Sequence, residues 1–304
     1  MPDEKIPDEK MPDEKPDPVD EAVVAQVAEV GEDASADAAE KKPSGVLARF
    51  FALPTDSLPK TLFIAVCVCL VASMIVSAAA VSLRPTQAVN KLKDKQMNIL
   101  QVAGLYEPGV DVVDAFSAFE PQVLEISSGA FTDQFNAAEF DDRAAASDPE
   151  LSVELEEDPA SIGRQAKYVT VYLLRDDAGD IDKVVLPIHG YGLWSTLYGF
   201  IALEENGNDI YGLQFYEHAE TPGLGAEVDN PRWKALWPGK QLTDDEGVLQ
   251  ITVAKTAPPA GSDYHVDALA GATLTTVGVN NLVRFWMGEA GYAPFLANLK
   301  AGEI

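Results

Sequence analysis

The chain has 304 residues and a formal net charge of −27, and this length leaves room for one sizeable domain or two smaller ones. The negative field repels polyphosphate and no basic patch offsets it, so the sequence predicts no nucleic-acid partner. Both cysteines, Cys67 and Cys69, lie in one apolar run, which excludes a disulfide or thiolate metal site from the large domain.

Residues 1–45 are predicted to form a disordered acidic tail, followed by a juxtamembrane segment at 46–60. Pro-Asp-Glu-Lys occurs three times between residues 2 and 15, and residues 1–42 carry 14 acidic and five basic side chains. Without a sustained apolar stripe, such a segment cannot bury enough surface to offset its ordering entropy. It can serve as a solvated spacer or as a tail that docks on a partner.

Residues 61–83 carry no charge and are flanked by Lys60 and Arg84. A run of this length suits a helix that crosses a hydrocarbon core of about 30 Å, so we predict a single transmembrane helix. A cleaved signal peptide is disfavoured, because the run starts late and no small-x-small cleavage site follows it. Basic residues are balanced on its two sides, so the positive-inside rule gives no orientation.

Residues 84–110 are predicted to form a membrane-proximal helix and linker, because 90–105 has a helical apolar rhythm that Pro108 and Gly109 end. Residues 111–304 are predicted to form the folded domain. Within it, the acidic stretch 144–158 is typical of a surface loop.

The folded domain shows strand patterns separated by short polar turns, which favours an antiparallel sheet. A helix is expected to begin at Thr273, as a threonine N-cap, with apolar positions between 274 and 286 and an end at Gly288; a short helix follows Pro294. The fold class is therefore α+β, with helices flanking a mainly antiparallel sheet. The predicted strands are 167–175, 183–188, 197–204, 210–216 and 248–255.

Gly271, Ala272 and Thr273 stand at the start of this predicted helix. Free N–H groups and the positive end of the helix dipole converge there, which favours a phosphate. By itself the pattern is weak, because small residues before a capping threonine are common.

Three motifs give the pattern a family context. Residues 267–273, Asp-Ala-Leu-Ala-Gly-Ala-Thr, resemble the Asp-x-x-Ser/Thr-Gly-Ala-Thr sequence modified by periplasmic FMN transferases, although Ala270 replaces the usual hydroxyl residue. Residues 189–200 and 218–227 also resemble segments of one family, as do 280–288 and 294–296. Roughly residues 60–300 thus resemble the NqrC family, whose members are FMN-binding parts of the sodium-translocating NADH:quinone oxidoreductases.

The resemblance implies FMN esterified through its phosphate to Thr273, and an electron carrier that is not catalytic alone. It implies association with the other members of a respiratory complex of six subunits that uses NAD and ubiquinone and transports sodium. It also implies maturation by an FMN transferase, a single-pass position in a bacterial inner membrane and a periplasmic flavin domain. The NADH site would lie on another polypeptide of the complex, since this chain has no Gly-x-Gly-x-x-Gly unit.

The other motif residues are predicted to form a flavin cradle. The Pro-Gly-Leu-Gly turn at 222–225 permits close approach of backbone to a planar ring, and aromatic or aliphatic side chains can cover it. Alternatively, these residues form an ordinary turn, a core aromatic and a loop cap. The predicted cofactor-binding residues are Thr273, Gly271, Ala272, Leu193, Trp194, Glu220, Thr221, Gly223, Leu224 and Thr275.

We predict no catalytic residue and no metal site. His189 and His218 stand alone at strand ends without a third ligand nearby in the sequence. Two alternative functions stay open: the related flavin subunit of an Rnf-type ferredoxin:NAD complex, and a non-redox membrane-tethered binding module in which Thr273 merely caps a helix.

Overall fold

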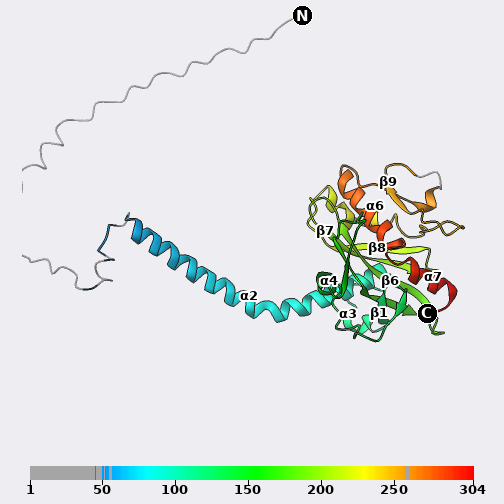
Figure 1. The fold of residues 1–304 in the computed structure, drawn as a ribbon, viewed down its shortest axis with the longest axis horizontal. Coiled ribbons are helices and arrows are strands. Elements are labelled where there is room, and N and C mark those ends of the chain that lie inside the picture. Colours follow the sequence, from blue (N-terminus) through cyan, green and yellow to red (C-terminus); the bar gives the residue numbers. More distant parts are fainter. Residues whose placement is uncertain (1–44, 46–49, 51, 55–56, 258–260) are drawn as a thin grey trace, which may run out of the picture. The chain divides into compact units, whose positions relative to one another are not determined.

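The computed structural model describes residues 45, 50, 52–54, 57–257 and 261–304. The chain divides into two compact units, residues 1–78 and 79–304, each described here by itself. The predicted tail, 1–45, lies outside the described residues except for Gly45. The described part of the first unit is mainly the first half of helix α2 (Figure 1).

Helix α2 spans Leu58–Val102 without interruption and contains Pro85. The predicted span and the predicted membrane-proximal helix are therefore one continuous helix. Within the described residues, α2 is the one helix long and apolar enough to cross a membrane. Its apolar first half is exposed, as lipid-facing residues would be, whereas Ile99 and Leu100 near its end are fully buried.

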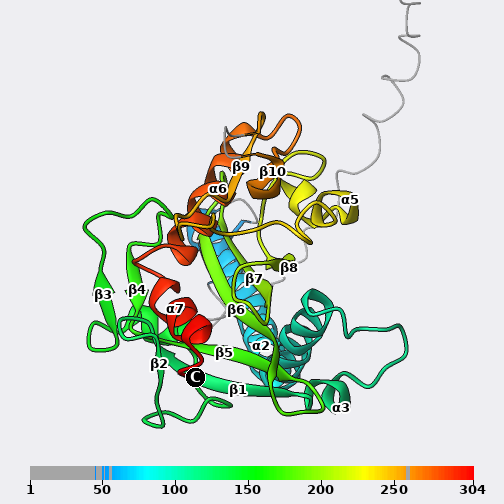
Figure 2. The ribbon, with the colours of Figure 1, turned by 90° about the vertical axis from the view of Figure 1, so that its right-hand side faces the viewer.

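The second unit is built on a six-stranded antiparallel sheet in the order β2-β1-β5-β6-β7-β8 (Figure 2). Two small two-stranded sheets accompany it. The predicted α+β class with a mainly antiparallel sheet is confirmed. The six strands are β2 (Ala130–Phe131), β1 (Phe119–Glu125), β5 (Tyr168–Arg175), β6 (Ile181–Tyr191), β7 (Thr196–Glu204) and β8 (Ile210–Glu217).

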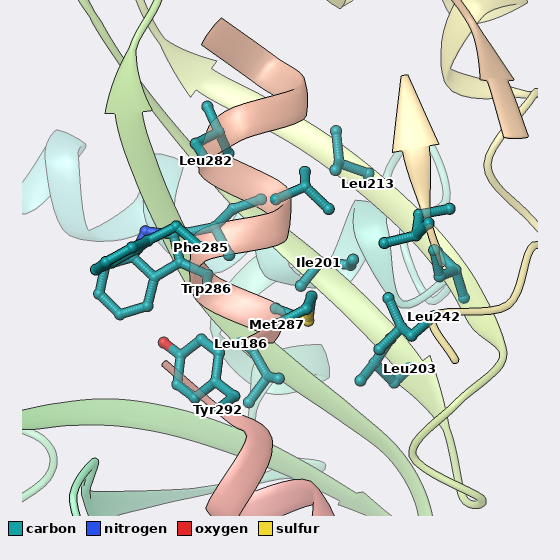
Figure 3. Close-up of a cluster of buried hydrophobic side chains, with 14 of the residues drawn as sticks. Leu186, Ile201, Leu203, Leu213, Leu242, Leu282, Phe285, Trp286, Met287 and Tyr292 are labelled. Carbon is teal, nitrogen blue, oxygen red and sulfur yellow. The ribbon is translucent and has the colours of Figure 1, made fainter. Parts of the chain in front are cut away.

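Alternate residues of the central strands bury into two different cores, because successive side chains of a strand point to opposite faces. On β6, Leu186 belongs to the larger core and Val185 to the smaller one. The larger core holds α6 (Thr273–Met287) and α7 (Ala293–Ala301); Figure 3 shows Trp286 and Tyr292 packed there. The smaller core holds the end of α2.

Two sequence-based expectations differ from the structure. Only β9 (Thr252–Ala254) forms within 248–255, and it pairs in parallel with β10 (His265–Asp267). The stretch 144–158 is not merely a loop, since it holds most of α4 (Asp142–Ser147), begun by an Asp141 cap, and all of β3 (Ser152–Glu154). The remaining elements are α3 (Val112–Phe116), β4 (Arg164–Ala166), η1 (Gly225–Asp229), α5 (Pro231–Lys234) and η2 (Ser262–Tyr264).

Candidate functional site

Thr273 is the first residue of α6, and its side chain is exposed. Ala272, not Thr273, occupies the N-cap position and makes no side-chain cap. The expectation that Thr273 caps the helix is therefore wrong. Its hydroxyl stands at the exposed helix N-terminus, where first-turn N–H groups lack intrahelical acceptors.

The segment before Thr273 is held by Thr276. Its hydroxyl donates to the carbonyl of Ala272 at 2.9 Å and accepts the N–H of Leu269 at 3.1 Å. Gly271 adopts a positive φ of 76°, which lets the chain turn into the helix. Ala270 is exposed at this turn, so no internal contact requires a hydroxyl there.

Glu220 joins two of the sequence motifs. It is 5% exposed, and its Oε1 accepts the N–H groups of Leu193 at 3.0 Å and Trp194 at 2.9 Å. Its Oε2 accepts the hydroxyl of Thr275 at 2.7 Å. Burial raises the pKa of Glu220, but these hydrogen bonds, the Trp194 one foremost, outweigh burial and lower it below its ordinary value.

Glycines allow these segments to approach each other closely. A Cβ at Gly225 would lie 2.5 Å from Oε2 of Glu220, and a Cβ at Gly278 would lie 2.4 Å from the carbonyl oxygen of Tyr191. A Cβ at Gly271 would lie 3.3 Å from the side chain of Leu224. The turns at 192–195 and 221–225 therefore both meet the first two turns of α6.

Large apolar side chains remain exposed on these three segments. Trp194 is 65% exposed, so it is not the core aromatic that the alternative interpretation required. Leu274 and Val277 join the set from α6. We call these residues the apolar rim: Tyr191, Leu193, Trp194, Leu224, Leu274 and Val277.

The remaining candidates have different surroundings. Thr221 is exposed, and its carbonyl accepts the N–H of Leu224 at 3.1 Å, while Gly223 lies at the tip of the turn with a φ of 76°. His218 bonds Asp229 at 2.8 Å. Asp267 is exposed, and its Oδ1 lies 3.2 Å from Nε2 of His265. Within the described part of the chain, no three metal-ligating side chains come together.

The residues present fit FMN. An exposed hydroxyl and a free helix N-terminus match a phosphate, and the apolar rim matches a planar ring. Glu220 uses both carboxylate oxygens within the protein, so its geometry supports positioning of the cradle more than direct contact with a cofactor.

The family comparisons agree with this geometry. Residues 192–288 match the family described as the FMN-binding domain. The chain is 49% identical over 257 residues to the NqrC protein of the Na(+)-translocating NADH-quinone reductase of Pseudomonas aeruginosa, covering 82% of this chain and 98% of the relative. The chain belongs to the NqrC family.

Other members of the NqrC family give the same result. The corresponding protein of Yersinia pestis is 45% identical, covering 82% of this chain and 96% of its own. Two crystal structures also match over 70% of this chain. Shewanella oneidensis NqrC is 38% identical with a TM-score of 0.65, and the match covers 99% of that chain. The Parabacteroides distasonis homologue is 26% identical with a TM-score of 0.54, and the match covers 96% of that chain.

Membership in the NqrC family makes the chain a membrane-associated flavoprotein component of an oxidoreductase complex. The Rnf-type alternative is accordingly set aside. The motifs that carried the resemblance at the sequence level are the segments that Glu220 and Gly278 bring together around Thr273.

Proposed function

We propose that this chain carries FMN joined through its phosphate to the hydroxyl of Thr273 and passes electrons between redox centres of a sodium-translocating NADH-quinone reductase. The observation that carries the proposal is the position of Thr273: exposed, first in α6, and two residues before Thr275, which Glu220 joins to the turn at 192–195. FMN supplies one- and two-electron redox chemistry when it is bound.

The chain's own residues hold and orient the cofactor in this proposal. First-turn N–H groups of α6 face the phosphate, and the dipole of α6 stabilises its charge. Leu193, Trp194 and Leu224 cover the ring, while Glu220 and Thr275 fix the turn that presents Trp194. A phosphoester at Thr273 would keep the carrier from dissociating during turnover.

The proposal extends to assembly and location. An FMN transferase acting on residues 267–273 would attach the cofactor, and the domain from 111 to 304 would then lie in the periplasm of a bacterial inner membrane. The other members of the complex of six subunits would supply the NADH site and the quinone site. A C-terminal reporter fusion tests the orientation, and reporter activity in the cytoplasm would contradict it.

Peptide mass spectrometry tests the covalent flavin directly. The full chain, expressed with an FMN transferase, should carry the mass of an FMN phosphoester on the peptide containing Thr273. Thr273→Ala should lose that mass, whereas Thr275→Val, which removes the hydroxyl two residues further along α6 but keeps its volume, should retain it. Folded protein without any flavin would favour a non-redox binding module instead.

A further inference from the structure

The central sheet splits between β5 and β6. These strands pair only from Tyr172↔Val185 to Arg175↔Ile181, whereas β5 continues beside β1 to Tyr168 and β6 continues beside β7 to Tyr191. Figure 2 shows β6 leaving the direction of β5 beyond the paired region. An open wedge therefore separates Val169 from Ile188.

A cavity of about 360 Å³ occupies this wedge. Helix α4 and the loop at 161–164 form its walls, and Trp286 contributes from the last turn of α6. This volume lies within the range of small-molecule sites in proteins. About half of the lining residues are polar or charged, among them the cations Arg143 and Arg164 and the carboxyl group of Asp142. Neither Thr273 nor any residue of the apolar rim lines it.

Arg143 offers the cavity a cation with free donors. Its guanidinium lies 3.5 Å from the centre of the Tyr198 ring, and its Nη2 contacts Glu217 at 2.9 Å and the hydroxyl of Tyr216 at 3.3 Å. Among the described residues, its Nε and Nη1 have no acceptor. Each of these two donors can give one charge-assisted hydrogen bond to an anionic oxygen.

His189 adds a neutral polar group. Its ring stacks on Tyr198 with centroids 5.5 Å apart and lies 5.0 Å from Trp286. Burial, helped by the charge of Arg143, lowers the pKa of His189 to about 4, so the imidazole is uncharged at neutral pH. Neither ring nitrogen has a hydrogen-bond partner in the part of the chain that the structure describes. Each is therefore available to a ligand.

The loop at 161–164, which lines the cavity, is held in a strained backbone conformation. Ser161 has a φ of 53°, the one positive φ among the described residues other than glycine. The carboxylate of Asp158 fixes this loop by accepting the N–H of Ile162 at 3.0 Å and that of Gly163 at 2.6 Å. Strain held in place by such contacts is typical of binding sites that form before the ligand arrives.

We propose that this cavity is a second ligand site, separate from the flavin site, and that it binds a small carboxylate with an aromatic or otherwise unsaturated body. The carboxylate would face Arg143, and the body would lie against His189 and Trp286. Inorganic phosphate would satisfy Arg143 but leave the apolar wall of Val169 and Ile188 uncovered.

Isothermal titration of the full chain in detergent with 2-naphthoate tests the site. Saturable binding at one site is expected, with inorganic phosphate and the uncharged 2-naphthamide each binding about tenfold more weakly or worse. Arg143→Gln should weaken naphthoate binding by about tenfold or more. Arg175→Gln, which removes an arginine paired with Glu120 at 2.9 Å outside the cavity, should change it less than about twofold.

Two further variants locate the binding. Ala146→Leu adds volume inside the cavity without removing a charge, so it should weaken naphthoate while leaving the melting temperature within a few degrees of the parent. Trp194→Ala, on the apolar rim, should leave affinity unchanged. The proposal fails if naphthoate does not bind at millimolar concentration, if the amide binds equally well, or if only Trp194→Ala abolishes binding. None of these results depends on whether Thr273 carries flavin.

Discussion

Thr275 donates its hydroxyl to Oε2 of Glu220 at 2.7 Å, across 55 positions of sequence. The other oxygen of the carboxylate accepts N–H groups from Leu193 and Trp194. One buried side chain therefore fixes the first turn of α6 and the turn at 192–195 together. Thr273 belongs to the same first turn of α6.

Glu220→Gln should destabilise the domain by about 1–3 kcal/mol, because an amide nitrogen would face donors that now bond a carboxylate oxygen. Urea unfolding followed by tryptophan fluorescence measures the loss. Glu139→Gln changes an exposed glutamate and should stay within about 0.5 kcal/mol of the parent. Equal stability of the two variants would show that Glu220 does not stabilise the contact between α6 and the turn at 192–195.

Gly278→Ala should force α6 away from the turn at Tyr191. The new Cβ would lie 2.4 Å from a backbone carbonyl oxygen, which no side-chain rotation can relieve. Overpacking of this kind costs about 1–3 kcal/mol. Val277→Ala, at a half-exposed neighbour in the same helix, should cost much less. Thermal melts of both variants make the comparison, and a Gly278→Ala variant as stable as the parent would refute this close packing.

The end of α2 is part of the folded domain's core. Leu100 is fully buried among residues such as Val185 and Phe200, whereas Leu92, two turns earlier, is 56% exposed. Leu100→Ala should therefore cost about 2–5 kcal/mol of unfolding free energy, and Leu92→Ala less than about 1 kcal/mol. Denaturant unfolding in detergent compares them. Similar costs would mean that the helix end does not pack against the sheet.

Asp142 should give the domain a measurable pH dependence. Burial raises the pKa of its carboxyl to about 6, in spite of the nearby positive charge of Lys95. The folded state therefore binds the proton more tightly than the unfolded chain, whose aspartate pKa is about 3.9. Stability should rise as pH falls from about 6 to about 4, by about 1–3 kcal/mol at most.

The comparison of parent and Asp142→Asn at pH 7 and pH 5 isolates this effect. The low pKa of His189 opposes it in the same pH range, but that contribution is common to both proteins and cancels in their difference. The parent should gain stability relative to the variant on acidification. Asp141→Asn, a conservative change at the cap of α4, should follow the parent. If the difference in unfolding free energy between the parent and Asp142→Asn is the same at both pH values, the pKa of Asp142 is not raised in the folded protein.

Local patterns in the sequence predicted the four consecutive strands β5 to β8, because apolar and β-branched residues there are bounded by polar turns. Strand β1 escaped prediction, since Glu120, Pro121 and Gln122 break its apolar alternation and only pairing with β5 makes it a strand. The region 248–255 looked like one strand, yet Val248 instead donates its N–H to Asp244 in a turn.

The three motifs predicted which segments build the site, but not how they are joined. The contact of Glu220 with Trp194 spans 26 positions. The residues next to Glu220 in the sequence do not show whether its carboxylate joins two segments of the protein or contacts a cofactor. Val277 fitted the apolar rhythm of α6, but the helix turns it outward on to the apolar rim. The wedge between β5 and β6 was also unpredictable, because it depends on where strand pairing stops.

Trp194 separates cofactor covering from structural packing. Because its side chain is 65% exposed, Trp194→Ala should change the unfolding free energy of flavin-free protein by less than about 0.5 kcal/mol. If FMN is attached at Thr273 and lies on the apolar rim, the same substitution should shift the visible absorption band and the reduction potential of the flavin. Trp233 is buried, and its indole N–H donates to the carbonyl of Asp267. Trp233→Phe should therefore lower the unfolding free energy and have little effect on the absorption band and reduction potential of the flavin. A flavin spectrum and potential unchanged in Trp194→Ala would place the ring away from this side chain, even with the phosphoester at Thr273 intact.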